Sequence, residues 1–253
     1  MIEEPYRWVE AVRNRREYLD DQLAGVSPVV GLSYRDGVLL LTTTPGPRKL
    51  FEVYNHLAFA AVGHPADIEK LRKAVIDVAH VEGFNLSSRD VTLLRLVNYG
   101  LGPLMKGAFD EIFRSPFIAK VLMSELDSQR QEETFYTVDA DGSFGMSLGL
   151  GVVAGSEKAQ EAAIQRLAEV EANTLSLEDA LAKALEAWAV GRLCATDEEV
   201  EPDEAAITQC LGEMLARQRV EAAVLDRTLP KKSKFRLLSP EEMAVATAIY
   251  TAE

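Results

Sequence analysis

Residues 27–63, SPVVGLSYRDGVLLLTTTPGPRKLFEVYNHLAFAAVG, contain four strand-like runs in close succession. The first two runs, Val29–Tyr34 and Val38–Thr43, are rich in β-branched and aliphatic residues. They are joined by a turn that contains Asp36-Gly37, which is a strong hairpin signal between such runs. A Pro-Gly-Pro turn ends the second run, and two more short strands are expected on either side of Asn55. This stretch therefore predicts an antiparallel sheet close to the start of the chain.

Helical and strand-like segments alternate around this stretch. Residues 5–24 predict an amphipathic helix, because apolar side chains recur on one side of it. A second helix is expected from Pro65 to near Gly83, and a third from Ser88, a candidate N-cap, with a kink or break near Gly100. Strands are expected at 117–126, 134–139 and 150–155.

The second half of the chain continues the alternation. Helices are expected at 156–172 and 176–193, and the latter opens with Ser176 and Asp179 as a capping box. Residues 196–204 are acidic and predict a solvated loop or a partner-docking patch. A helical segment at 205–218 and two strands, VEAAVLD and KFRLLS, follow. This order predicts an α+β sandwich of two antiparallel sheets, each covered by helices.

Composition excludes several classes of function. The net charge of −13 argues against nucleic-acid or anionic-membrane partners, which attract basic proteins. The two cysteines and three histidines are too scattered for a metal site, so we expect no metal and no cofactor. No secretory signal and no apolar run long enough to span a membrane are recognisable, so a cytoplasmic location is expected.

Several strings of the sequence, taken in order, resemble the proteasome core-particle family, in its bacterial, actinobacterial-like α-type branch. After an arginine-rich opening helix come VVGLSYRDGVLLL, RKLFEVYNHLAFAAVG, HVEGFNLSSRDVT, FYTVDADGS and VEAAVLDRTLPKKSKFRLL. The resemblance implies the four-layer αββα sandwich of the N-terminal-nucleophile hydrolases, with an N-terminal α-type helix. It also implies one subunit domain over 1–253, with a tail and ring-contact helix at 1–26 and the sandwich at 27–253.

The resemblance places the nucleophile position at Ser27 and not in the threonine triplet that ends the second strand. The acidic partner of the catalytic set then falls at Thr43 and its serine at Ala154, so that Lys49 is the one catalytic residue that remains. An N-terminal nucleophile needs its own free amine as base, and Pro28 further restricts the backbone at Ser27. The resemblance thus implies a noncatalytic subunit. A self-processing hydrolase that uses Ser27 and Lys49 is the alternative.

A noncatalytic α-type subunit implies a set of partners. Identical subunits would form a ring, seven-membered as in the family, that stacks on catalytic β-type subunits and docks a ring ATPase or other activator. Lys49 would meet the C-terminal carboxylate of the activator, although a solvated lysine after a turn is the simpler interpretation of the residues alone. A divergent ring without a β partner is a further alternative.

The expected ring-contact and gate residues all lie in the opening segment. With four residues before Pro5, the tail that would close the pore is short, and we expect a poorly gated pore. The residues are Met1, Ile2, Glu3, Glu4, Pro5, Trp8, Val12, Arg15 and Leu19.

Overall fold

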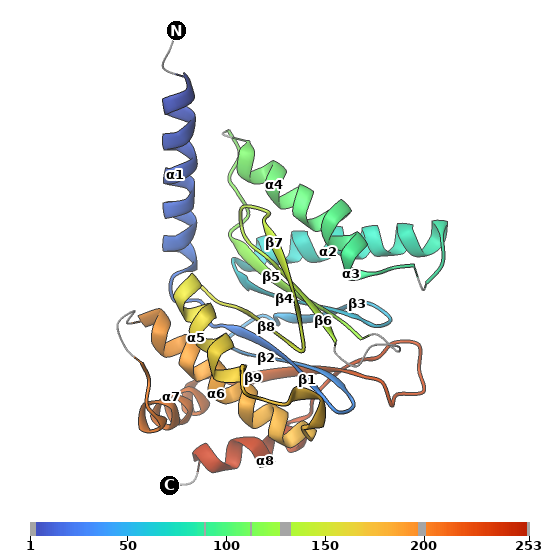
Figure 1. The fold of residues 1–253 in the computed structure, drawn as a ribbon, viewed down its shortest axis with the longest axis vertical. Coiled ribbons are helices and arrows are strands. Elements are labelled where there is room, and N and C mark those ends of the chain that lie inside the picture. Colours follow the sequence, from blue (N-terminus) through green and yellow to red (C-terminus); the bar gives the residue numbers. More distant parts are fainter. Residues whose placement is uncertain (1–3, 89, 112, 127–132, 197–200, 252–253) are drawn as a thin grey trace.

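Two five-stranded antiparallel sheets lie face to face, and helices cover the outer face of each (Figure 1). The structure, a computed structural model, describes residues 4–88, 90–111, 113–126, 133–196 and 201–251. The four layers confirm the predicted α+β sandwich.

The first sheet is built on the predicted hairpin, with the strand order β10-β9-β2-β1-β8. Gly37 lies in the tight turn at φ +152°, where an added Cβ would lie 1.9 Å from the carbonyl oxygen of Leu225, so only glycine fits. The strands are β1 (Val29–Tyr34), β2 (Gly37–Thr44), β8 (Leu150–Val153), β9 (Arg219–Asp226) and β10 (Phe235–Leu237).

The second sheet has the order β3-β4-β5-β6-β7. Four of its strands were predicted, and the fifth, β7, was missed because Gly145 and Ser147 interrupt its apolar residues. The strands are β3 (Leu50–Tyr54), β4 (Leu57–Gly63), β5 (Ala119–Glu125), β6 (Thr134–Val138) and β7 (Phe144–Leu148).

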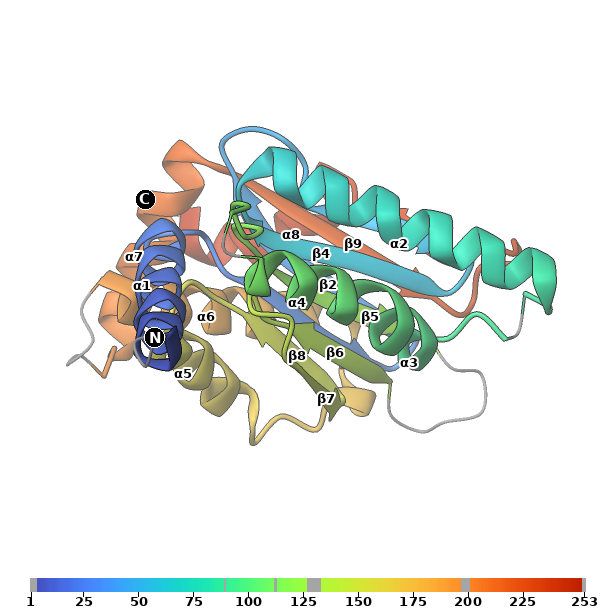
Figure 2. The same cartoon turned by 90° about the horizontal axis from the view of Figure 1, so that it is seen from above.

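The helices fall into two groups by the sheet that they cover, as the two views show (Figures 1 and 2). Over the second sheet lie α2 (Pro65–Asn85), α3 (Leu93–Arg95), the π-helical turn η1 (Leu96–Leu101) and α4 (Gly102–Asp110). Over the first sheet lie α5 (Glu157–Leu167), the 3-10 turn η2 (Ala172–Thr174), α6 (Leu177–Thr196), α7 (Glu204–Arg217) and α8 (Pro240–Thr251). The opening helix, α1 (Glu4–Leu23), extends beyond both sheets.

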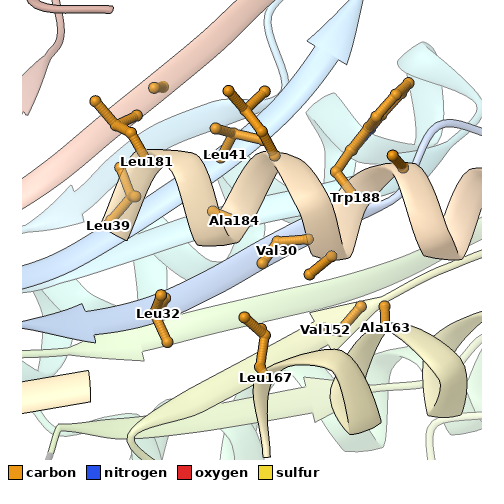
Figure 3. Close-up of a cluster of buried hydrophobic side chains, with 14 of the residues drawn as sticks. Val30, Leu32, Leu39, Leu41, Val152, Ala163, Leu167, Leu181, Ala184 and Trp188 are labelled. Carbon is orange, nitrogen blue, oxygen red and sulfur yellow. The ribbon is translucent and has the colours of Figure 1, made fainter. Parts of the chain in front are cut away.

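Three apolar layers hold the sandwich together, one between the sheets and one under each group of helices. Under α5 and α6, side chains of β1 and β2 alternate between this layer and the one between the sheets (Figure 3). Trp188 of α6 is the largest fully buried side chain of the chain that the structure describes, with 2% of its surface exposed. Burial of one such side chain contributes about 2–3 kcal/mol.

Several helix boundaries differ from the prediction, and the helix expected at 156–172 ends at Leu167. The third helix begins at Leu93 and not after Ser88, and the backbone N–H of Leu93 donates to the carboxylate of Glu125, 3.0 Å away. The interruption near Gly100 is the π-helical turn, which continues into α4 without a break. The cap comes from a distant strand, so the local sequence could not show it.

Two of the helices over the first sheet, α6 and α8, begin with a capping box. The predicted one is confirmed, because Ser176 Oγ accepts from the backbone N–H of Asp179 at 3.1 Å. The second opens α8, where the backbone N–H of Ser239 donates to Glu242 at 2.8 Å. We did not predict α8, although its capping sequence is local. None of the described helices is long and apolar enough to cross a membrane.

Candidate functional site

Ser27 lies two residues before β1, and side chains from two other elements, α6 and β2, hydrogen-bond to its hydroxyl. Trp188 Nε1 donates to Ser27 Oγ at 2.9 Å, and Ser27 Oγ lies 2.9 Å from Thr43 Oγ1. Thr43 in turn donates to Gln218 Oε1 at 2.7 Å. Because the proton of Thr43 is used toward Gln218, Ser27 must be the donor to Thr43. The result is one directed chain from indole to serine to threonine to amide.

This arrangement lacks the base that a serine nucleophile requires. The backbone nitrogen of Ser27 is part of the peptide bond to Val26 and offers no free amine. The hydrogen-bond partners of its hydroxyl that the structure describes are an indole and a second hydroxyl, and neither takes up a proton near neutral pH. Ala154, at the position of the family's serine, is a fully buried methyl group.

Lys49 lies immediately before β3 and is connected to Ser27 indirectly, through Thr43. Its Nζ donates to the carbonyl oxygen of Thr43 at 3.2 Å, while its backbone N–H donates to Glu221 Oε2 at 3.0 Å. Glu221 also accepts from the backbone N–H of Leu50 at 3.2 Å. The structure therefore brings Ser27 and Lys49 to the same threonine, one at its side chain and one at its carbonyl.

Burial shifts the pKa of both charged groups beside Thr43, Lys49 and Glu221. It lowers the pKa of Lys49, and the nearby Glu221 carboxylate opposes that effect only in part. It raises the pKa of Glu221, against the two backbone N–H groups that favour its ionised form. In the described part of the chain, no carboxylate lies within ion-pair distance of Lys49 Nζ. The ammonium is thus partly desolvated and is bound to a neutral oxygen.

A pocket of about 530 Å³ opens beside Lys49. Its walls are mostly apolar and come from the β2–β3 connection, β3 and the first turns of α2, and Arg48 and Glu69 lie on the same walls. The side chain of Arg72 holds Glu69 through two hydrogen bonds of 2.8 Å, which lowers the pKa of Glu69 to about 2. Since Glu69 is already bound, Arg48 and Lys49 are the cations of the pocket that can meet an anionic group. The apolar lining residues are Pro45, Pro47, Phe51, Pro65 and Ile68.

The expected ring-contact residues of the opening helix fall into two groups. Leu19 is buried with Phe109 and Ala140, and Arg15 donates to the backbone carbonyls of Phe109 at 2.6 Å and Glu111 at 2.8 Å. These contacts fix the second half of α1 to the end of α4. A cation such as Arg15 is favourable at a helix C-terminus, where the last backbone carbonyls have no partner within the helix.

The first half of α1 is less covered. Val12 is half-buried, and Trp8 is 44% exposed. Glu4 and Pro5 form the start of the helix, while Met1, Ile2 and Glu3 lie outside the described residues. Part of the acidic segment, residues 197–200, also lies outside them, and Asp203 caps α7 by accepting from the backbone N–H of Ala206 at 2.8 Å.

Three residues of the site were not found from the sequence: Trp188, Gln218 and Glu221. They come from α6, from the end of α7 and from β9, more than 160 residues away from their partners Ser27, Thr43 and Lys49. No local motif marks any of them. Gln218 and Glu221 come close to Thr43 and Lys49 because β9 pairs with β2 in the first sheet.

The fold defines a class, the four-layer sandwich of the N-terminal-nucleophile hydrolases, and Ser27 is tied into structural hydrogen bonds at its first hairpin. Comparison with known proteins gives the family. No family model matches the chain. The chain is 30% identical over 236 residues to a protein named proteasome subunit alpha from Streptosporangium roseum, covering 91% of this chain and 81% of the relative.

Other relatives give the same result. Proteins of the same name from Saccharomonospora viridis and Paenarthrobacter aurescens are 29% and 30% identical over 238 and 240 residues. These matches cover 92% of this chain in both cases, and 86% and 92% of the relatives. The chain belongs to the proteasome α-subunit family, as the motifs of its sequence predicted.

Proposed function

We propose that this chain is a noncatalytic cytoplasmic subunit, one domain over residues 1–253, that forms a seven-membered ring. The ring scaffolds and gates a proteolytic core particle. The main support for a noncatalytic role is the directed hydrogen-bond chain at Ser27. This chain ends on the amide of Gln218 and includes no base. The names of the relatives support assembly with other proteasome subunits.

The mass of the freshly purified chain tests this proposal against self-processing. An intact chain of 27.8 kDa in a native ring is expected, together with no hydrolysis of a fluorogenic peptide by the chain alone. A chain shortened by its first 26 residues would mean that Ser27 had been released, and the hydrolase alternative would replace the proposal.

We further propose that Lys49 docks the C-terminal carboxylate of an activator, such as a ring ATPase. Three features support this role: the ammonium has a neutral oxygen as its partner, it is partly desolvated, and it lines a pocket with apolar walls. A charge-assisted bond from a partly buried ammonium to a carboxylate is stronger than one between neutral groups. The apolar walls would cover the side chains that precede the carboxylate.

The face for catalytic β-type subunits is proposed to be the outer surface of α2, α3 and η1. Four large apolar side chains are exposed there, which is unusual for a surface that stays in water. They are Val81 at 58%, Phe84 at 90%, Leu94 at 55% and Tyr99 at 74% exposed. This face favours a ring with a partner over a ring that stands alone. The exposed first half of α1, with Trp8, would lie at the pore.

A further inference from the structure

The first half of β9 has an outer edge with which no strand of the described chain pairs. On its inner side, β2 pairs with the whole length of β9. On its outer side, β10 pairs only with residues 223–225, and the chain then turns away to begin α8 at Pro240. The backbone of residues 219–221 is therefore open on the side where β10 would continue.

The backbone groups of Val220 point to this open edge. In an antiparallel pair, every second residue directs both its N–H and its C=O to the same neighbouring strand. On the β10 side, the backbone N–H of Leu238 donates to the carbonyl oxygen of Ala222 at 2.9 Å. The backbone N–H of Asp226 donates to the carbonyl oxygen of Lys234 at 2.8 Å on the same side. Val220 continues this series two residues earlier, so its N–H and C=O face the open edge.

A pocket of about 540 Å³ lies along this edge. Apolar side chains of α7, β9, β10 and α8 form most of its walls, and Arg48 and Arg219 lie exposed on the remaining walls. Among the residues that the structure describes, neither arginine forms an ion pair. The pocket beside Lys49 is a different one, because its other walls come from β3 and α2.

The two faces of β9 give the edge two different linings. Val220 packs in the apolar layer under the helices, whereas Ala223 packs between the sheets. Because side chains alternate along a strand, Arg219 and Glu221 lie on the same face as Ala223. Glu221 accepts there from two backbone N–H groups of the β3 segment. A strand beside this edge would therefore meet a carboxylate at 221, an apolar face at 220 and a guanidinium at 219.

We propose that this pocket binds an extended segment of a partner protein as an added strand, antiparallel to β9. The backbone of the segment pairs with Val220, as in other cases of strand addition to an open sheet edge. A segment that continues the direction of β10 passes Glu221 first, then Val220 and then Arg219. Read from its N-terminus, it therefore carries a basic or neutral residue, an apolar residue and an acidic residue.

The chemistry of the pocket accounts for each of these three positions. A basic or neutral residue avoids repulsion by Glu221, the apolar side chain packs toward Leu238 and Met243, and the acidic side chain meets Arg219 and Arg48. The site requires neither the ring nor the activator, so it goes beyond the proposed function and can fail without it.

The peptide Thr-Thr-Lys-Leu-Glu-Thr-Thr, labelled at its N-terminus and amidated at its C-terminus, tests the site by fluorescence anisotropy. We expect it to bind the purified chain, and the reversed order Glu-Leu-Lys to bind roughly tenfold more weakly, because both charges then face like charges. Methylation of the leucine nitrogen should weaken binding as much, because it removes the donor to the Val220 carbonyl. No binding at about 1 mM peptide, or equal affinity for the three peptides, would overturn the proposal.

Variants of the chain place the peptide in this pocket. Arg219→Glu should weaken binding of the Lys-Leu-Glu peptide roughly tenfold, and a Lys-Leu-Lys peptide should recover part of the loss. Arg217→Glu is the matched control, because Arg217 is also exposed but lies outside the pocket, and it should bind like the wild type. Lys49→Ala should also bind like the wild type, which separates this site from the docking of a chain end.

Hydrogen exchange tests the backbone pairing directly. The Val220 amide should exchange more slowly when the Lys-Leu-Glu peptide is bound, because its N–H gains an acceptor. Unchanged exchange at Val220 in the bound state, or wild-type affinity of Arg219→Glu, would refute strand addition at this edge.

Discussion

Replacement of Lys49 by alanine is the most direct test of the docking role. The change removes the ammonium but leaves the backbone N–H that donates to Glu221, so the local fold is expected to persist. It also removes the hydrogen bond from Nζ to the carbonyl oxygen of the buried Thr43. We therefore expect Lys49→Ala to keep the ring at a cost in stability of about 1–3 kcal/mol.

The size of the effect follows from the contact that is lost. A hydrogen bond to a charged group contributes about 1.5–3 kcal/mol, and more is lost when the carboxylate remains buried without a partner. Since about 1.4 kcal/mol corresponds to a factor of ten, the Kd for a carboxylate peptide should rise roughly 10- to 150-fold. Lys49→Arg keeps the charge, and we expect it to lose less than Lys49→Ala.

The assay is fluorescence anisotropy with a labelled peptide from the C-terminus of the cognate ring ATPase, in its free-acid and amidated forms. The amidated peptide should bind the wild type about as weakly as the free acid binds Lys49→Ala. Lys73→Ala, on the exposed side of α2, is the control and should bind like the wild type. Equal affinity of wild type and Lys49→Ala for the free-acid peptide would refute the docking role.

Three further outcomes are expected. Ser27→Ala leaves the Trp188 N–H without its acceptor and should lower the stability to urea by about 1–3 kcal/mol while peptide hydrolysis by the particle is unchanged; a loss of hydrolysis would contradict the structural role. Arg15→Ala removes the cation from the end of α4 and should cost about 1 kcal/mol, or about 2–4 °C in a thermal melt, whereas an unchanged melt would show that α1 is not fixed there. Docking requires charged Lys49, whose pKa is lowered by burial, so peptide affinity should fall as pH rises through that lowered pKa; Lys49→Arg should extend binding to higher pH, and identical pH profiles would contradict the assignment.

The local part of the fold could be predicted from the sequence because its signals are local. Asp36-Gly37 predicts the first hairpin, and the observed register pairs Tyr34 with Gly37 as a tight turn requires. Strand β7 was missed because two of its five residues are glycine and serine, and its apolar residues face solvent instead of the core. The start of the helix at Leu93 depends on Glu125, and no nearby residue shows it.

The candidate site could be predicted only in part, because most of its residues are far apart in the sequence and come into contact only in the folded chain. Ser27 and Thr43 lie close together because β1 and β2 are one hairpin, and the hairpin could be read from the sequence. Trp188 is buried mainly through its indole ring, which alone would explain a tryptophan on an apolar helix face. Its N–H reaches Ser27 only because α6 crosses the start of β1, a relation between segments 161 residues apart.

Thr43 links the two proposals for this site, the absence of catalysis at Ser27 and the docking role of Lys49. An acidic residue at this position would pair with Lys49 and could take part in proton transfer at Ser27. The neutral threonine instead accepts a hydrogen bond from Ser27 and donates one to Gln218, and none of these three groups is charged. With threonine at this position Lys49 has a carbonyl partner, and burial lowers the pKa of its ammonium. A partly desolvated ammonium with no carboxylate of the described residues within ion-pair distance gains more from an incoming carboxylate than one that is already paired, so a neutral residue at position 43 favours the proposed binding of an anionic chain end.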